Sequence, residues 1–295
     1  MLSLQASPTL SELQIHVWQK EVSEYPKELL DLAHPPSELY AIGRESALIG
    51  PRVSIVGTRN STGYGERATR TLARSLARAG VTVISGMARG IDAAAHRTAL
   101  EEGSPTVAVL GTGVDVPYPV GHRHLHRAIA EKGLVLSENP PGAKAQKGSF
   151  PKRNRIIAAL APVTIVVEAG FRSGALNTAS QALELGRTVA AVPGPIDSEQ
   201  SRGSNQLLRD GAVLIAEPDD ALALLGISSP LEKTPPPTLP DSEQKVWDAI
   251  KGGFVQTDAL PAATDLTVAE CLAAITSLEI LGLVESTLAG EIRRR

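Results

Sequence analysis

The sequence predicts an α/β fold: an extended Rossmann-like, doubly wound and mostly parallel sheet, followed by a small C-terminal winged-helix-like domain. Three observations predict it. Short β-branched runs alternate with helical segments in residues 46–226, a proline-rich stretch follows at 227–240, and a helical segment with a final hairpin pattern fills 241–295. A length of 295 residues fits about two domains.

Seven short apolar runs predict the strands of the sheet. They carry apolar residues at successive positions, which is typical of parallel strands covered by helices on both faces. Helical periodicity between them, as in Glu66–Ala79 and Asp92–Glu101, predicts right-handed crossovers. The runs are Val53–Val56, Val81–Ser85, Thr106–Leu110, Leu134–Ser137, Val163–Val167, Thr188–Val192 and Ala212–Ala216.

The two ends of the chain differ from this pattern. Residues 1–45 predict a short extension without a complete helical domain, with one candidate helix around Leu10–Lys20. Five prolines between Gly226 and Asp241 predict a semi-rigid linker.

The segment after the linker has the order of a winged helix. Helices are expected at Ser242–Ile250, near Thr257–Leu260 and at Thr267–Leu281, and a hairpin then turns at Gly290. The third helix is acidic, which disfavours reading of duplex DNA. Whether this domain binds DNA or a protein stays open.

Composition excludes several classes of protein. The chain is 42% hydrophobic and 21% charged, which is unlike a disordered chain. Its longest apolar run, Ile156–Val167, is interrupted by Pro162 and is too short for a membrane span, and no signal peptide is visible. The single cysteine, Cys271, excludes a disulfide framework. We therefore expect a cytoplasmic protein without a membrane partner.

Charge is distributed unevenly along the chain. Residues 51–170 hold 16 Lys and Arg against 8 Asp and Glu, whereas residues 171–295 hold 10 against 17. Such blocks of opposite sign indicate that one face of the first domain meets a polyanion.

Glycine-rich loops follow the first two predicted strands, where ligands of doubly wound sheets bind. Gly57–Gly65 and Ser85–Asp92 each lead into a helix and can cradle an anion. A plain tight turn is the alternative for the first loop. The spacing is not that of a dinucleotide fingerprint, which disfavours a dehydrogenase. Asp92 and His96 have acid/base spacing, but a helix-capping Asp with a packed His is the favoured interpretation.

Two later segments add to the candidate site. Lys144–Arg155 contains five cations and Phe150, a composition that suits phosphates and a stacked base; a solvated loop with Phe150 in the core is the alternative. The loop Glu168–Thr178 offers small and hydroxyl residues to phosphate, and Glu168 is the alternative catalytic group there.

Other reactive patterns are weak. His122, His124 and His126 lack a neighbouring carboxylate and split across a helix, and Cys271 falls in a buried helical register. No Ser/His/Asp order or Walker A lysine appears. We expect no catalytic residue, no cofactor and no metal.

The ordered set of motifs resembles the DNA-processing protein A family (DprA, also called Smf). The resemblance covers roughly residues 25–225, and it is specific because many short motifs occur in the same order. They are Tyr25-Pro26, Pro35–Tyr40, Gly57-Thr58-Arg59, Ser85–His96, Gly113–Pro119, Phe150–Ile157, Glu168–Leu176, Gly186-Arg187 and Pro193-Gly194.

The resemblance implies a single-stranded DNA-binding protein that dimerises through the later part of its Rossmann domain. It implies protection of incoming DNA during natural transformation and loading of RecA on the strand. The DNA-contact positions it implies are Arg59, Gly86, Ala88, Gly90, Lys147, Phe150, Lys152, Arg153, Asn154, Arg155, Ser173 and Gly174. The family's helical N-terminal domain is expected to be absent or vestigial.

Two other functions compete with this one. A nucleotide-binding N-glycosidase resembling the LOG-like phosphoribohydrolases would need a Pro-Gly-Gly-x-Gly-Thr loop and a following glutamate, and Thr178–Gln181 supplies none. A duplex-DNA regulator would act through the winged helix, whose acidic third helix disfavours it. With 3% aromatic residues, the chain is expected to contact many phosphates and stack one or two bases.

Overall fold

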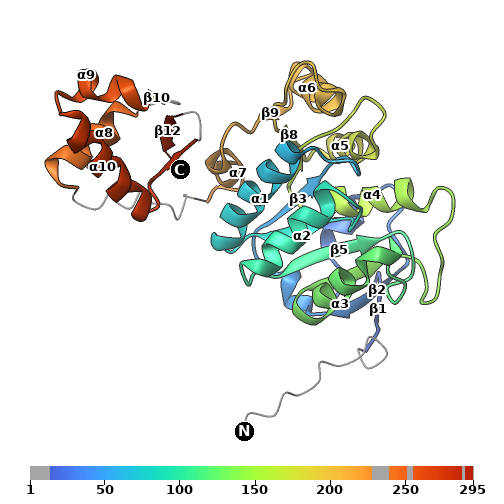
Figure 1. Cartoon of the computed structure of the whole chain (residues 1–295). Helices are drawn as coiled ribbons and strands as arrows, with labels where there is room; N and C mark the ends of the chain where they lie inside the picture. The colour runs from blue at the N-terminus through green and yellow to red at the C-terminus, as the bar shows by residue number, and fades with distance from the viewer. Residues whose placement is uncertain (1–13, 228–238, 251–254, 288–289, 295) are drawn as a thin grey trace, which may run out of the picture. The chain divides into compact units, whose positions relative to one another are not determined.

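The structure is a computed structural model that describes residues 14–227, 239–250, 255–287 and 290–294 (Figure 1). The chain divides into two compact units, Met1–Pro230 and Leu231–Arg295. Most of the predicted linker, residues 228–238, lies outside the described residues.

The first unit is built on a nine-stranded sheet in the order β1-β2-β6-β5-β4-β3-β7-β8-β9. β1 pairs with β2 and β2 with β6 in antiparallel fashion, and every other pair is parallel. The strands are β1 (His16–Gln19), β2 (Glu38–Gly43), β3 (Arg52–Val56), β4 (Thr82–Ser85), β5 (Thr106–Leu110), β6 (Leu134–Ser137), β7 (Val163–Val166), β8 (Thr188–Ala191) and β9 (Val213–Leu214).

The α/β class and the mostly parallel sheet are confirmed, and all seven predicted runs are strands, β3 to β9. The helix expected around Leu10–Lys20 is wrong where the structure describes it, because His16–Gln19 forms β1. The sheet also starts before residue 46, since β1 and β2 belong to it. β2 alternates its exposure and pairs with β6 almost a hundred residues later, a long-range contact that no local pattern reveals.

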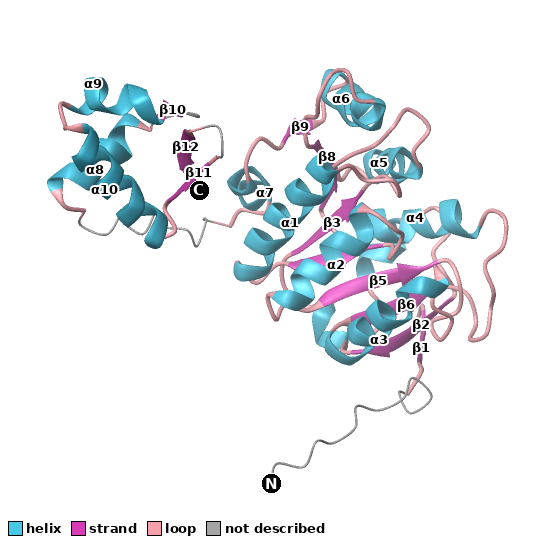
Figure 2. Cartoon of the chain, viewed as in Figure 1, coloured by secondary structure: helices cyan, strands magenta, loops and turns pink. Residues whose placement is uncertain are grey.

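Helices cover both faces of the sheet (Figure 2). One face packs against α1, α2, α3 and α7, and the other against α4 and α5. Residues of β3 contribute to the cores on both faces of the sheet. Val53 and Ile55 pack with α1, α2 and α7, and Val56 belongs to the core that includes α4 and α5. The helices of this unit are α1 (Gly63–Arg78), α2 (Ile91–Glu101), α3 (Arg123–Lys132), α4 (Ser149–Ala159), α5 (Gly174–Glu184), α6 (Arg202–Arg209) and α7 (Pro218–Leu224), with 3-10 turns η2 (Lys27–Asp31), η3 (Glu45–Leu48), η4 (Val120–His122) and η5 (Glu199–Ser201).

The second unit has its own core and the predicted winged-helix order. The buried residues of α8, α9 and α10 pack with Val284 and Ile292 of its sheet, and Cys271 is buried among them. The sheet order is β10-β12-β11, of which only β10 was unexpected. The elements are α8 (Asp241–Ala249), β10 (Val255–Gln256), η6 (Thr257–Ala259), α9 (Leu260–Thr264), α10 (Val268–Ile280), β11 (Val284–Ser286) and β12 (Glu291–Arg294).

In the described part of the chain, no single helix is long and apolar enough to cross a membrane. Thr257–Thr264 and Val268–Ile280 meet the length and composition only as a pair bent by 112°.

Candidate functional site

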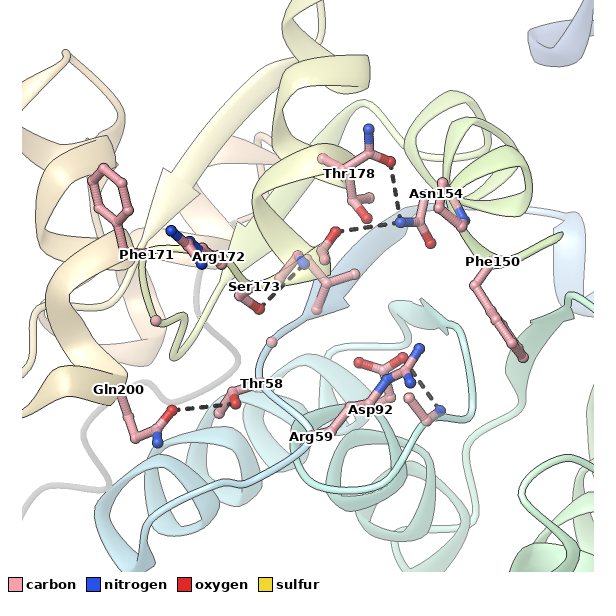
Figure 3. Close-up of a pocket in the computed structure, with 18 of the residues that line it drawn as sticks. Thr58, Arg59, Asp92, Phe150, Asn154, Phe171, Arg172, Ser173, Thr178 and Gln200 are labelled. Carbon is pink, nitrogen blue, oxygen red and sulfur yellow. Dashed lines mark hydrogen bonds between the residues drawn. The ribbon is translucent and has the colours of Figure 1, made fainter. Parts of the chain in front are cut away.

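A cleft of about 840 Å³ opens beyond the carboxyl ends of β3 and β7 (Figure 3). The chain passes from β3 to β4 on one side of the sheet and from β7 to β8 on the other, so the cleft lies at a topological switch point. Its walls come from the loop after β3, the first turns of α4, the loop after β7 with the start of α5, and the segment from η5 to α6.

The loop after β3 is held from the loop after β7. The Thr58 amide donates to the Glu168 carbonyl at 2.6 Å, and the Thr62 amide and hydroxyl donate to the Glu168 carboxylate at 2.9 and 2.7 Å. Thr62 in turn caps α1 by accepting from the Gly65 amide. Glu168 is buried, and both of its carboxylate oxygens accept hydrogen bonds from Thr62, which favours a structural role over the catalytic alternative.

Arg59 stands exposed at the tip of that loop, beside Phe150. Its guanidinium carbon lies 5.3 Å from the centre of the Phe150 ring, which is within cation–π range. The Tyr118 ring also packs against Phe150, with the two ring centroids 5.0 Å apart. Phe150 lines the cleft and is half-buried, so its core role and its stacking role do not exclude each other.

Arg153 has an unexpected environment for a predicted DNA contact, because it is only 4% exposed. Its guanidinium donates to the Gly86 carbonyl at 2.8 Å and to the Val109 carbonyl. Burial lowers the pKa of Arg153 to about 10 against the opposing effect of Asp92. Arg153 therefore ties the loop after β4 to β5, and its polar atoms are largely used there.

Asp92 holds the same loop from the other side. Its carboxylate accepts from the Gly86 amide at 3.1 Å and the Ala88 amide at 3.4 Å, so it bonds the preceding loop rather than capping α2. Burial raises the pKa of Asp92, and the charge of Arg153 opposes that rise. His96 does not complete an acid/base pair: its Nδ1 lies 2.8 Å from the Thr106 hydroxyl, and burial lowers the pKa of His96 to about 3. This is the packed histidine that the sequence favoured.

Asn154 connects α4 to α5 across the cleft. Its amide nitrogen donates to the Gly174 carbonyl at 3.3 Å and to Asn177 Oδ1 at 3.2 Å. At the start of α5 the Ser173 hydroxyl accepts from the Ala175 amide at 3.3 Å. Polar groups from two helices thus line one wall (Figure 3).

The structure brings part of the predicted set to the cleft. Its lining includes Arg59, Ala88, Phe150, Arg153, Asn154, Ser173 and Gly174. Lys152 and Arg155 instead meet Glu138, at 3.2 and 2.5 Å, on another side of α4. Lys147 is exposed on the loop before α4. The five predicted contact residues that do not line the cleft are Gly86, Gly90, Lys147, Lys152 and Arg155. Their direct contact with DNA stays a prediction.

Several lining residues were not singled out from the sequence. Phe171 and Arg172 fell inside a loop that was noted for its small residues, although an aromatic beside a cation after a strand is a usable signal. Gln200 and Arg202 were not named, although the sequence suggests Gly203-Ser204-Asn205 as a further loop at the same edge of the sheet; the structure places those three residues in α6. The polar and aromatic lining residues that were not named as contact positions are Thr58, Phe171, Arg172, Asn177, Thr178, Glu199, Gln200 and Arg202.

Two of the three histidines of the 122–126 segment contact backbone carbonyls, whereas His124 is exposed. His122 Nδ1 lies 3.0 Å from the Met87 carbonyl and His126 Nε2 lies 2.7 Å from the Val114 carbonyl. No group of three or more His, Cys, Asp or Glu side chains that could hold a metal occurs among the residues that the structure describes.

The family follows from matches that cover both units. Residues 16–226 match the DNA recombination-mediator protein A family, and residues 230–290 match the DprA winged helix domain. The chain belongs to the DprA/Smf family. Its C-terminal unit is therefore a DprA winged helix, and its family is one of DNA recombination mediators.

Relatives of the DprA/Smf chain include proteins from distant bacteria. It is 41% identical to the DNA processing protein DprA of Streptococcus pneumoniae, over 68% of this chain and 70% of that protein, and 34% identical to the protein Smf of Escherichia coli, over 95% and 78%. The X-ray structure of the S. pneumoniae protein aligns with a TM-score of 0.69 at 39% identity, over 71% of this chain and 74% of that one. DNA processing protein A of Helicobacter pylori, solved for its single-stranded DNA binding mode, aligns with a TM-score of 0.66 at 33% identity, over 73% and 97%.

Proposed function

We propose that this DprA/Smf chain binds single-stranded DNA in the cleft between the loops after β3 and β7. The observation that carries the proposal is the convergence of Arg59, Arg172 and Arg202 on one cleft that also contains Phe150. Within the described residues, none of these arginines takes part in an ion pair. Unpaired guanidinium groups beside an aromatic ring suit phosphates and a stacked base.

A single strand fits this site better than a duplex does. A base can stack on Phe150 only when it is unpaired and unstacked from its neighbours in the strand. The cleft is also lined by loops and helix starts rather than formed by a projecting helix. The single-stranded DNA binding described for the H. pylori relative supports the same choice.

The proposed role is non-catalytic and needs no cofactor. The buried carboxylates Asp92 and Glu168 already hold backbone and hydroxyl donors of the surrounding loops. The N-glycosidase alternative predicts release of free base from nucleoside monophosphates. We expect no release above the rate without protein, and release that is lost on Glu199→Gln would overturn the proposal, because Glu199 is the exposed carboxylate of the cleft.

We further propose that the protein protects incoming strands in the cytoplasm during natural transformation and passes them to RecA. The support is family membership together with the single-strand site. The test is strand exchange by RecA on DNA coated with single-strand binding protein. The chain is expected to shorten the lag, and Arg59→Ala is expected to lose this effect in proportion to its loss of DNA affinity.

A homodimer through the later part of the Rossmann unit is also proposed. β9 is an edge strand with both residues exposed, Val213 at 40% and Leu214 at 51%, and Leu183 of α5 is 59% exposed. An open edge with apolar side chains suits a second copy. Light scattering after size exclusion should give a dimer mass for the wild type and a monomer mass for Leu214→Asp.

The binding experiment is a titration of labelled oligo-dT and a matching duplex. Tight binding of the strand with weaker binding of the duplex is the expected result. Arg59→Ala removes a cation inside the cleft, and Lys147→Ala removes one on the exposed loop outside it. Comparing the two affinities shows which of these two places contributes to binding.

A further inference from the structure

Phe171 and Arg172 occupy the corner of a tight turn in the wall formed by the loop after β7. The Ser173 amide donates to the Gly170 carbonyl at 2.9 Å, which closes the turn and leaves Phe171 and Arg172 at its two central positions. Phe171 is 73% exposed. Small and polar residues dominate such positions, so an exposed phenylalanine is unusual there.

The turn stands on a fixed base. The Gly203 and Ser204 amides of α6 donate to the Ala169 carbonyl at 2.7 and 3.3 Å. A side chain at Gly203 would meet the Ala169 and Gly170 carbonyls at 2.8 Å, so helix and turn are in close backbone contact. The exposed ring is therefore presented by an anchored turn.

The ring belongs to the wall opposite Phe150. Figure 3 shows Phe171 and Phe150 on opposite sides of the cleft, with Arg172 and Ser173 following Phe171 in the same wall. Gln200 joins this side to the first loop, with its Oε1 3.4 Å from the Thr58 hydroxyl. Arg202, at the start of α6, adds a second cation to Arg172.

We propose that Phe171 is a second base-stacking platform, and that Arg172 and Arg202 hold the phosphates of the strand as it runs from Phe150 to Phe171. This inference rests on the proposed binding of single-stranded DNA. An exposed ring flanked by guanidinium groups on the wall of an anion-binding cleft suits a nucleotide, since the same surface offers stacking and phosphate contact.

The test measures oligo-dT affinity for Phe171→Ala, Phe171→Leu and Phe171→Tyr. Loss of one stacked base should weaken binding by about 5- to 150-fold in Phe171→Ala. Leucine keeps an apolar side chain without a π-face and should weaken binding similarly, whereas tyrosine should restore it. Ile49→Ala is the matched control, because Ile49 is 77% exposed but precedes the amino end of β3, whereas the cleft lies beyond the carboxyl end of that strand.

A second measurement reports the stack directly. In Phe171→Trp the new indole fluorescence should be quenched by oligo-dT, against the background of the native Trp18 and Trp247. Unchanged affinity in Phe171→Ala together with no quenching in Phe171→Trp would overturn the second platform. If Phe150→Ala still weakens binding in that case, the proposed function stands, whereas a wild type that binds no oligo-dT overturns the proposed function itself.

Discussion

Arginine side chains at this cleft are of two kinds, exposed and buried. Arg59, Arg172 and Arg202 are exposed and line the cleft. Arg153 is buried and donates hydrogen bonds to the Gly86 and Val109 carbonyls. The sequence could not separate them, because Arg153 sits in a run of cations and its partners lie 67 and 44 residues away. Exposure decides which charge is free for a phosphate.

Gly86 provides the space that the buried Arg153 needs. A Cβ at position 86 would lie 2.5 Å from Arg153 Nη2 and 2.6 Å from its Cζ. We expect Gly86→Ala to lower the free energy of unfolding by about 1–3 kcal/mol, the usual cost of overpacking a filled site. Urea unfolding measures it. Gly121→Ala is the control, since a Cβ there meets nothing within 4 Å, and equal stabilities of the two variants would contradict the assignment.

His96 predicts a loss of stability in acid. Burial, with smaller effects of Arg153 and His122, lowers the pKa of His96 to about 3 from 6.5. Below pH 6.5 the His96 imidazole is protonated in the unfolded chain but stays neutral in the folded chain, so the free energy of unfolding falls as the pH falls. Between pH 8 and pH 5 this group alone should lower the free energy of unfolding by about 2 kcal/mol.

The measurement is urea unfolding at the two pH values for wild type, His96→Asn and His124→Gln. His96→Asn should lose most of this pH dependence, and His124→Gln should keep it because His124 is exposed. A pH dependence that is the same in all three proteins would show that His96 titrates normally.

The elements that shape the cleft are coupled through one side chain. Glu168, after β7, binds both donors of Thr62 at the start of α1, and its backbone carbonyl binds Thr58. The position of Arg59, which lies between Thr58 and Thr62, therefore depends on a residue from the other half of the sheet. These hydrogen bonds explain why a carboxylate is buried beside the cleft.

Glu168→Gln should weaken DNA binding by displacing Arg59. The amide replaces an acceptor with a donor that faces the Thr62 donors, and hydrogen bonds to charged groups contribute about 1.5–3 kcal/mol. We expect an oligo-dT affinity lowered by up to about tenfold, with faster exchange of the Thr62 amide. Glu184→Gln, on the exposed side of α5, is the control. An unaltered affinity with an unaltered Thr62 exchange rate would exclude the coupling.

The strands show which parts of the fold a sequence can reveal. β3 to β8 could be predicted because each is a short β-branched run between helices, buried along most of its length. β1 could not, since three of its four residues are exposed or half-buried and its partner β2 lies about twenty residues on. At the cleft, the glycine loops and the Lys144–Arg155 run were visible in the sequence. The side chains that η5 and α6 contribute were not, because they reach the cleft only through the return of the chain to the switch point.

The whole molecule consists of two units with separate cores. The cleft lies entirely within the first unit. In the second unit the exposed side of α10 carries Val268, Leu272 and Ile280, and the helix sequence contains no Lys or Arg. A helix of this character is a poor reader of duplex phosphates.

A chain ending at Pro230 should therefore keep its single-strand affinity within about twofold at matched salt, since the arginines and rings of the cleft are all retained. The isolated unit Leu231–Arg295 should bind neither strand nor duplex. Fluorescence anisotropy with labelled oligo-dT and duplex tests both fragments, after circular dichroism has shown that each is folded. Retention of DNA binding by the isolated second unit would assign DNA recognition to the winged helix instead.

The salt dependence of oligo-dT binding, measured for wild type, Arg59→Ala and Ile49→Ala, shows whether the strand lies in this cleft. Each phosphate contact on a single strand adds about 0.7 to the slope of log affinity against log salt. We expect a steep slope for wild type and Ile49→Ala, and for Arg59→Ala weaker binding with a slope lower by about 0.7. Equal slopes and equal affinities in all three proteins would contradict the placement of the strand in this cleft.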